Sequence, residues 1–198
     1  MTTNILPARG RPREFDIDTA FDIGQNLFHQ HGYEAVGLAA LTKTLNIKPP
    51  SFYKAFGSKA AFFGRILDRY SASVLALEDI LPPERDPGEA LADLLERAAK
   101  TYAQNPKLRG CLVLEAARGG EDDESAVLAR RIAEGRRHQI RSFVALSHPK
   151  GAGAVTDYVT TTMSGLSASA REGMSKPRLL AVARAAATAV QFLLTNKN

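Results

Sequence analysis

The chain has 198 residues, 44% of them hydrophobic, with a formal net charge of +5 and no tryptophan, which allows one domain or two small ones that share a core. Its single cysteine, Cys111, excludes an internal disulfide and a cysteine-built zinc site and is compatible with a reducing cytosol. The basic charge fits a polyanionic partner without deciding it, and we expect a cytoplasmic protein because neither a signal peptide nor an apolar stretch long enough to span a bilayer is visible.

Residues 1–15 have the composition of a basic N-terminal arm, in which Arg9, Arg11 and Arg13 flank Gly10 and Pro12. Arginine side chains favour narrow A·T-rich minor grooves, where the electrostatic potential is most negative. We expect the arm to contact a minor groove if a DNA-binding domain follows it. A soluble tail is the alternative.

The first predicted helix covers residues 17–31. Asp16 is its expected N-cap, and Gly32 follows as a C-terminal glycine. Apolar residues at helical spacing predict one buried face, made of Ile17, Ala20, Phe21, Gly24, Leu27 and Phe28.

A second helix is predicted from about Gly37 to Leu45, with a left-handed turn at Asn46. The third begins near Lys48, which offers no side-chain acceptor as a cap. Pro49 and Pro50 carry no N–H group, so two donors that a helix start would leave unpaired are absent. A helix, a tight turn and a short polar helix together predict a helix-turn-helix.

The rest of the chain is expected to be helical, over residues 58–81, 87–104, 108–118, 126–146, 155–172 and 176–194, with an acidic loop over residues 119–125. Strand-like alternation is missing, so the predicted class is all-α. We divide the chain into the arm, a helix-turn-helix domain over residues 16–61, and a helical effector-binding and dimerisation domain over residues 62–198.

The N-terminal half of the third helix is expected to face a DNA major groove, with Lys48, Ser51 and Lys54 among the base readers. Phe52 would either pack on a thymine methyl group or fill the core. Tyr53 and Lys59 are expected to clamp phosphates, although a half-buried core tyrosine is the alternative for Tyr53. The full expected DNA-binding set is Arg9, Arg11, Arg13, Gly37, Thr42, Lys43, Lys48, Pro49, Ser51, Phe52, Tyr53, Lys54 and Lys59.

An apolar pocket with a few polar groups is the usual form of a small-molecule site. Candidate lining residues in the C-terminal part are Tyr70, Tyr102, Cys111, Phe143, Met163 and Met174, each with plain core packing as the alternative. Arg136, Arg137 and His138 are expected to form a solvated helix face, or else to pair with an anionic effector. No catalytic constellation, metal-ligand cluster or cofactor motif stands out, so an enzyme is not expected.

The last two helices are expected to form a homodimer interface, because small residues allow close helix approach and two such helices per subunit make a four-helix bundle. Packing within one subunit is the alternative. The expected interface residues are Tyr158, Val159, Thr162, Leu166, Leu179, Ala183, Ala186, Val190 and Leu194.

Residues 28–33, 41–47 and 51–59 resemble the TetR family of bacterial transcription regulators, with Tyr53, Phe56 and Lys59 at the family's spacing. The resemblance implies a homodimer with one helix-turn-helix per subunit and a divergent ligand-binding domain. The chain departs from the family pattern at Val36-Gly37, Asn46, Lys48 and Ala60. Gly37 then offers only its backbone N–H where the family has a hydroxyl for a phosphate.

The resulting expectation is a sequence-specific DNA-binding regulator, most simply a repressor that a small molecule releases from a palindromic operator. Its partners are a double-stranded DNA operator, a second copy and an unknown effector, with no membrane. Two alternatives stay open. One is a non-specific architectural DNA binder that the arginine arm leads. The other is a helical small-molecule-binding protein with a vestigial helix-turn-helix.

Overall fold

The computed structural model describes residues 16–195, and its only regular elements within that range are α-helices, which confirms the predicted class. The arm that carries Arg9, Arg11 and Arg13 lies outside the described residues. In chain order the helices are α1 Ile17–His31, α2 Leu38–Thr44, α3 Pro49–Phe56, α4 Lys59–Ser73, α5 Leu77–Ile80, α6 Pro87–Tyr102, α7 Leu112–Ala116, α8 Glu124–Ala145, α9 Ala152–Arg171 and α10 Lys176–Thr195.

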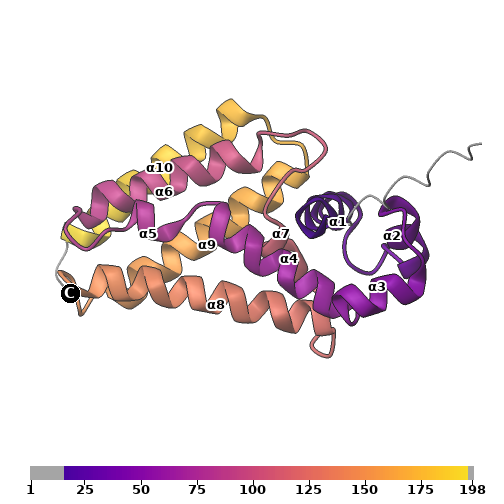
Figure 1. The fold of residues 1–198 in the computed structure, drawn as a ribbon. Helices are drawn as coiled ribbons and strands as arrows, with labels where there is room; N and C mark the ends of the chain where they lie inside the picture. Colours follow the sequence, from indigo (N-terminus) through magenta and orange to yellow (C-terminus); the bar gives the residue numbers. More distant parts are fainter. Residues whose placement is uncertain (1–15, 196–198) are drawn as a thin grey trace, which may run out of the picture.

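The first three helices gather at one end of the molecule, and α4 joins them to the rest (Figure 1). The helix signals read from the sequence are confirmed here. The Asp16 carboxylate caps α1 by accepting from the Asp18 and Thr19 amides. Asn46 has a φ of 53°, so the chain turns in the left-handed region between α2 and α3. Pro49 and Pro50 occupy the first positions of α3.

An aromatic cluster holds the three N-terminal helices against α4. Phe62 of α4 lies 4.4 Å from Phe56 of α3, 5.4 Å from Phe52 and 5.5 Å from Phe21 of α1, measured between ring centroids. Phe28 and Phe63 meet edge to face at 4.8 Å. Such pairs add about 0.5–1.5 kcal/mol each beyond the burial of their surface, so the cluster fixes the position of α3 on the body.

The prediction of one helix over residues 58–81 is wrong. Ser58 caps α4 as expected, but α4 ends at Ser73, and Leu75 follows with a φ of 56° before the short α5. Neither glycine nor proline marks this break in the sequence. A tertiary contact accompanies it, because the Arg136 guanidinium on α8 donates to the Ser71 and Leu75 carbonyl oxygens at 2.8 and 2.7 Å.

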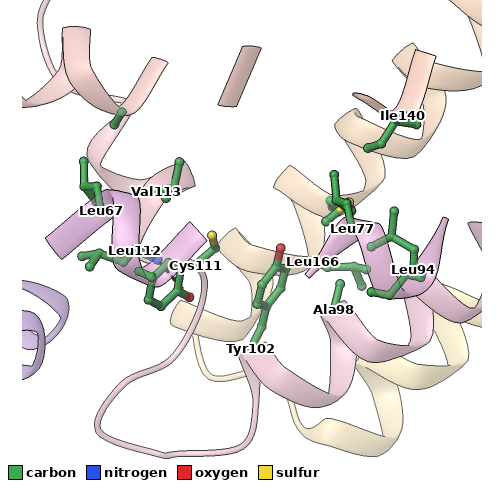
Figure 2. Close-up of a cluster of buried hydrophobic side chains, with 14 of the residues drawn as sticks. Leu67, Leu77, Leu94, Ala98, Tyr102, Cys111, Leu112, Val113, Ile140 and Leu166 are labelled. Atoms are coloured by element: carbon green, nitrogen blue, oxygen red, sulfur yellow. Dashed lines mark hydrogen bonds between the residues drawn. The ribbon is translucent and has the colours of Figure 1, made fainter. Parts of the chain in front are cut away.

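The remaining helices form the body. Helices α6 and α10 run side by side, α9 packs against both, and α8 lies along α4 and α9 (Figure 1). The expected piece over residues 108–118 shortens to α7, and α9 begins at Ala152, earlier than predicted. Figure 2 shows part of the apolar interior that these helices share, including Leu94 and Ala98 of α6 and Leu166 of α9.

Helix α10 corrects the expectation that no segment could span a bilayer. By length and composition alone it is apolar enough to do so, and most of its most apolar window is not buried inside the protomer. Its inner face packs against α6 and α9 through residues such as Leu179 and Val190. The core helix of a soluble protein can pass the same test, and one such helix is weak evidence for a membrane span.

Candidate nucleic-acid interface and effector cavity

The outer face of α3 presents polar and basic side chains to solvent. Ser51, Tyr53 and Lys54 are exposed on it, and Lys48 and Pro49 are exposed at its start. Tyr53 retains 52% of its surface, so it is not a fully buried core residue. These residues occupy the side of α3 that faces away from the aromatic cluster. A short helix with such a face is shaped to enter a major groove.

Two residues of the expected DNA-binding set are buried, so they do not belong to the exposed face of the helix-turn-helix. Phe52 is fully buried and packs on Phe56 and Phe62, so it belongs to the core and not to a groove-facing surface. The hydroxyl of Thr42 is also turned inward, since the residue is 6% exposed and donates to the Leu38 carbonyl at 2.9 Å within α2. Helical spacing alone did not separate these positions from their exposed neighbours.

The other expected contacts surround α3. Lys43 is exposed on α2. Gly37 is the N-cap of α2 and makes no side-chain cap hydrogen bond, while a Cβ atom at this position would meet nothing within 4 Å. Lys59 is half-buried, with its Nζ 3.9 Å from the ring centroid of Tyr33. This cation–π contact orients the ammonium group at the start of α4.

The body contains a cavity of about 520 Å³ between α4, α5 and α6 on one side and α8 and α9 on the other. Its volume lies in the range that small-molecule sites occupy. Four of the expected lining residues lie against it: Tyr70, Tyr102, Cys111 and Met163. Figure 2 shows Tyr102 and Cys111 among Leu77, Val113 and Ile140, apolar residues that line the same space.

Two predicted lining residues are not part of this cavity. Phe143 is a buried core residue, and Met174 lines a separate hollow between α9 and α10. The expectation missed Arg130, which lines the cavity, and it favoured a solvated face for Arg136 and Arg137, which line it too. All three arginines lie on the helix predicted over residues 126–146, but the sequence does not show which face of that helix points inward. The packing of α8 against α4 and α9 turns the face with the arginines toward the cavity.

The cavity lining includes polar groups that are neutral. The Tyr70 hydroxyl accepts from the Leu112 amide at 3.4 Å. Burial raises the pKa of the Tyr70 and Tyr102 phenols, and it also raises the pKa of the Cys111 thiol. All three groups therefore stay protonated near neutral pH and act as weak hydrogen-bonding groups in apolar surroundings.

A polar network links the cavity wall to the DNA-binding end. The Cys111 amide donates to Ser167 Oγ at 2.9 Å, and Ser167 Oγ donates to Glu115 Oε1 at 3.0 Å. The second oxygen of Glu115 pairs with Arg171 Nε at 3.3 Å. The Arg171 guanidinium then donates to the carbonyl oxygen of His29, near the end of α1, at 3.1 and 3.2 Å. The network thus joins α7, α9 and α1.

His29 is buried beside this network. Its ring lies edge to face on Tyr70 at 6.0 Å, and its Nε2 atom has no hydrogen-bond partner among the described residues. Burial lowers the pKa of His29, and the positive charge of Arg171 lowers it further. His29 is therefore neutral at pH 7, and no sequence pattern had singled it out.

Most of the expected dimer-interface residues pack inside the protomer. Val159, Leu166, Leu179, Ala183, Ala186, Val190 and Leu194 are buried, which corrects that part of the prediction in favour of packing within one subunit. Tyr158 and Thr162 are half-buried and line a hollow of about 390 Å³ between α9 and α10, together with the exposed Gly165, Val182 and Ala185. The outer faces of the two helices therefore remain accessible to a second copy.

Comparisons with known proteins agree with this arrangement. Residues 22–66 match the family described as bacterial regulatory proteins, tetR family. The chain is 42% identical over 186 residues to the HTH-type transcriptional repressor BdcR of Escherichia coli (strain K12), covering 93% of this chain and 94% of the relative. It is 29% identical over 194 residues to the HTH-type transcriptional repressor ComR of the same strain, covering 92% of each.

Among solved structures, a cysteine mutant of the TetR family transcriptional regulator CifR, complexed with 26-base-pair operator DNA, superposes with a TM-score of 0.77. The two sequences are 32% identical, and the match covers 90% of this chain and 99% of that one. The helix-turn-helix, the helical body and these similarities over nearly the whole length lead to one assignment: the chain belongs to the TetR family of bacterial regulatory proteins.

Proposed function

We propose that the protein is a cytoplasmic, dimeric transcriptional repressor that binds a palindromic operator through α3 and releases it when a small molecule fills the cavity of the body. The observation that carries the proposal is the exposed face of α3, with Ser51, Tyr53 and Lys54 directed away from a core that fixes the helix. The names of the relatives, repressors and an operator-bound regulator, support it.

The contacts follow from where each side chain lies. Ser51 and Lys54 read base edges, because they are exposed on the face of α3 that would enter the groove. Lys48, Pro49, Tyr53, Lys59, Lys43 and the Gly37 amide contact the phosphate backbone and set the register. Arg9, Arg11 and Arg13 reach the adjacent minor groove. The boundary between the DNA-binding and effector domains lies near residue 61, within α4.

The dimer forms through the outer faces of α9 and α10, not through their buried faces. On α10, Arg178, Val182, Ala185 and Ala189 follow one another at spacings of three and four residues and share a side of the helix. That stripe adjoins the hollow that Tyr158 and Thr162 line. A twofold axis across it would place one α3 in each of two half-sites, about one helical turn or more apart.

The proposal is tested by selecting bound sequences from a randomised duplex library with the purified full chain at two salt concentrations. Recovery of one palindrome that persists at the higher salt concentration is the expected result. Binding without an enriched motif, lost as salt rises, would show the architectural binder instead. Absence of binding at low salt would show that the helix-turn-helix no longer reads DNA.

A further inference from the structure

Two chemically different sets of residues line the cavity. Tyr102, Leu77 and Ile140 belong to the apolar set, in which the Tyr102 hydroxyl is neutral. An ionised ligand group placed against these residues would make no direct ion pair with them, which is unfavourable in a buried site. The apolar set therefore selects the uncharged body of a ligand.

The α8 wall of the cavity is basic. Arg130, Arg136 and Arg137 line it, and Glu134 is the acidic residue among the described lining residues. The Arg130 guanidinium is occupied by carbonyl oxygens of residues 117–121. Arg137 pairs with Asp157 and donates to Thr160 Oγ1 at 3.1 Å.

Arg136 differs from its neighbours. It is half-buried, and no carboxylate among the described residues lies within ion-pairing distance of it. Its guanidinium donates to two carbonyl oxygens only, those of Ser71 and Leu75. A guanidinium has five N–H donors and binds carboxylates in a two-pronged geometry. A positive charge without a counter-charge thus stands at the edge of an apolar cavity.

We propose that the effector is an amphipathic carboxylate, with its apolar body between Tyr102, Leu77 and Ile140 and its carboxylate at Arg136. This rests on the proposed function, because it names the chemistry of the molecule that releases the operator. Arg137 is the next residue on α8, lines the same wall and adds positive charge.

The same contact connects the ligand to DNA binding. Arg136 holds the carbonyl oxygens at the end of α4, and the N-terminal end of α4 follows α3 directly. A carboxylate competes with those carbonyls for the guanidinium. Binding then loosens the junction of α4 and α5 and shifts the helix that carries the DNA-binding end.

Isothermal titration of the DNA-free full chain with three matched probes tests the ligand class: decanoate, methyl decanoate and decylamine. The three share an apolar chain and differ in charge. Decanoate is expected to bind at least about tenfold more tightly than the other two, because a charge-assisted pair exceeds a neutral hydrogen bond. Equal or tighter binding of the ester or the amine, or no binding of any probe, would overturn the proposal.

The Arg136→Gln variant locates the carboxylate. It is expected to weaken decanoate binding about tenfold and to leave the ester nearly unchanged. Arg131→Gln, an exposed arginine on α8 that does not line the cavity, is the matched control and should bind decanoate as the parent does. Retention of the full carboxylate preference in a folded Arg136→Gln protein would overturn the assignment to Arg136. The comparison of probes on the unchanged chain decides the ligand class even if this variant does not fold.

Operator binding without any ligand is measured in parallel by fluorescence anisotropy. Decanoate, and not decylamine, is expected to release the operator. If the protein binds its operator but binds decanoate more weakly than the ester or the amine, only the proposed effector class is wrong. A chain that selects no operator contradicts the proposed function, while the titrations still report on the cavity.

Discussion

At the scale of the residue, Tyr53 and Lys54 are neighbours on α3 with different expected tasks. Both are exposed, but Lys54 lies one helical turn from Ser51, on the side assigned to base edges. Tyr53→Phe removes one hydroxyl donor to a phosphate, and we expect it to weaken binding to all DNA sequences by a similar factor. Lys54→Ala is expected to cost about tenfold on the selected operator and less on unrelated DNA.

Anisotropy titrations with operator and scrambled duplexes separate the two effects. The ratio of the two affinities should fall for Lys54→Ala and stay constant for Tyr53→Phe. A constant ratio for both variants would mean that Lys54 touches only the backbone.

The neighbouring Phe52 shows what a sequence leaves open at this scale. A periodic pattern predicted a helix with an inner and an outer face, and it predicted the exposed Ser51 and Lys54. It did not assign Phe52, because an aromatic ring suits either a thymine methyl or a core. The ring of Phe62 on α4 packs against Phe52, with 5.4 Å between the ring centroids, and this contact places Phe52 in the core. Contacts between separate helices carry this information, and local spacing does not.

His29 gives a prediction for pH dependence. Its pKa is lowered in the folded protein by burial and by Arg171, so below the unfolded value of about 6.5 the unfolded chain binds a proton that the native chain does not. The free energy of unfolding should therefore fall as pH decreases through this range. Urea unfolding of His29→Gln should show a smaller decrease between pH 7 and pH 5 than the parent.

His31→Gln, at an exposed position of the same helix, is the control for this change. If the parent and His29→Gln lose stability in parallel between the two pH values, the buried imidazole is not the group responsible.

At the scale of the element, the fold was predictable wherever local signals mark helix ends. Asp16, Asn46, the two prolines and Ser58 placed α1, α3 and the start of α4 to within a residue or two. The break after Ser73 was not predictable, because a left-handed Leu75 has no local reason to exist. The Arg136 contact from α8 supplies one. The sequence predicted an apolar pocket with a few polar groups, but the basic wall of the cavity depends on how α8 packs.

Arg171 makes a further prediction at this scale. It is the side chain that ties α9 to the end of α1 and to Glu115. Arg171→Gln is expected to keep operator affinity within about threefold, since the residue contacts the end of α1 and not α3, and to reduce the fraction of operator that the effector releases. Titrating the protein–operator complex with effector measures both quantities.

Arg141→Gln changes an exposed arginine on α8 that does not line the cavity and serves as the matched control. Full release by the Arg171→Gln protein would show that the signal reaches α1 by another route.

At the scale of the whole molecule, the apolar character of α10 finds its explanation in assembly. Its inner face is buried against α6 and α9, and its outer stripe with Val182 is exposed and is the proposed contact with a second copy. Val182→Glu places a charge in that stripe, and we expect a monomer in light scattering with at least a tenfold loss of operator affinity, because the two half-sites no longer bind as one unit. Thr195→Glu, at an exposed position of α10 outside that stripe, should remain dimeric.

The link between Arg171 and the His29 carbonyl joins residues that are 142 positions apart. A ribosome therefore releases the DNA-reading helices long before it makes the side chain that fastens them, and domains fold in the order of their synthesis. During synthesis the first three helices therefore emerge without this tie, and the tie forms only after Arg171 has emerged. Limited proteolysis should show that the first three helices are more resistant in the parent chain than in the Arg171→Gln variant.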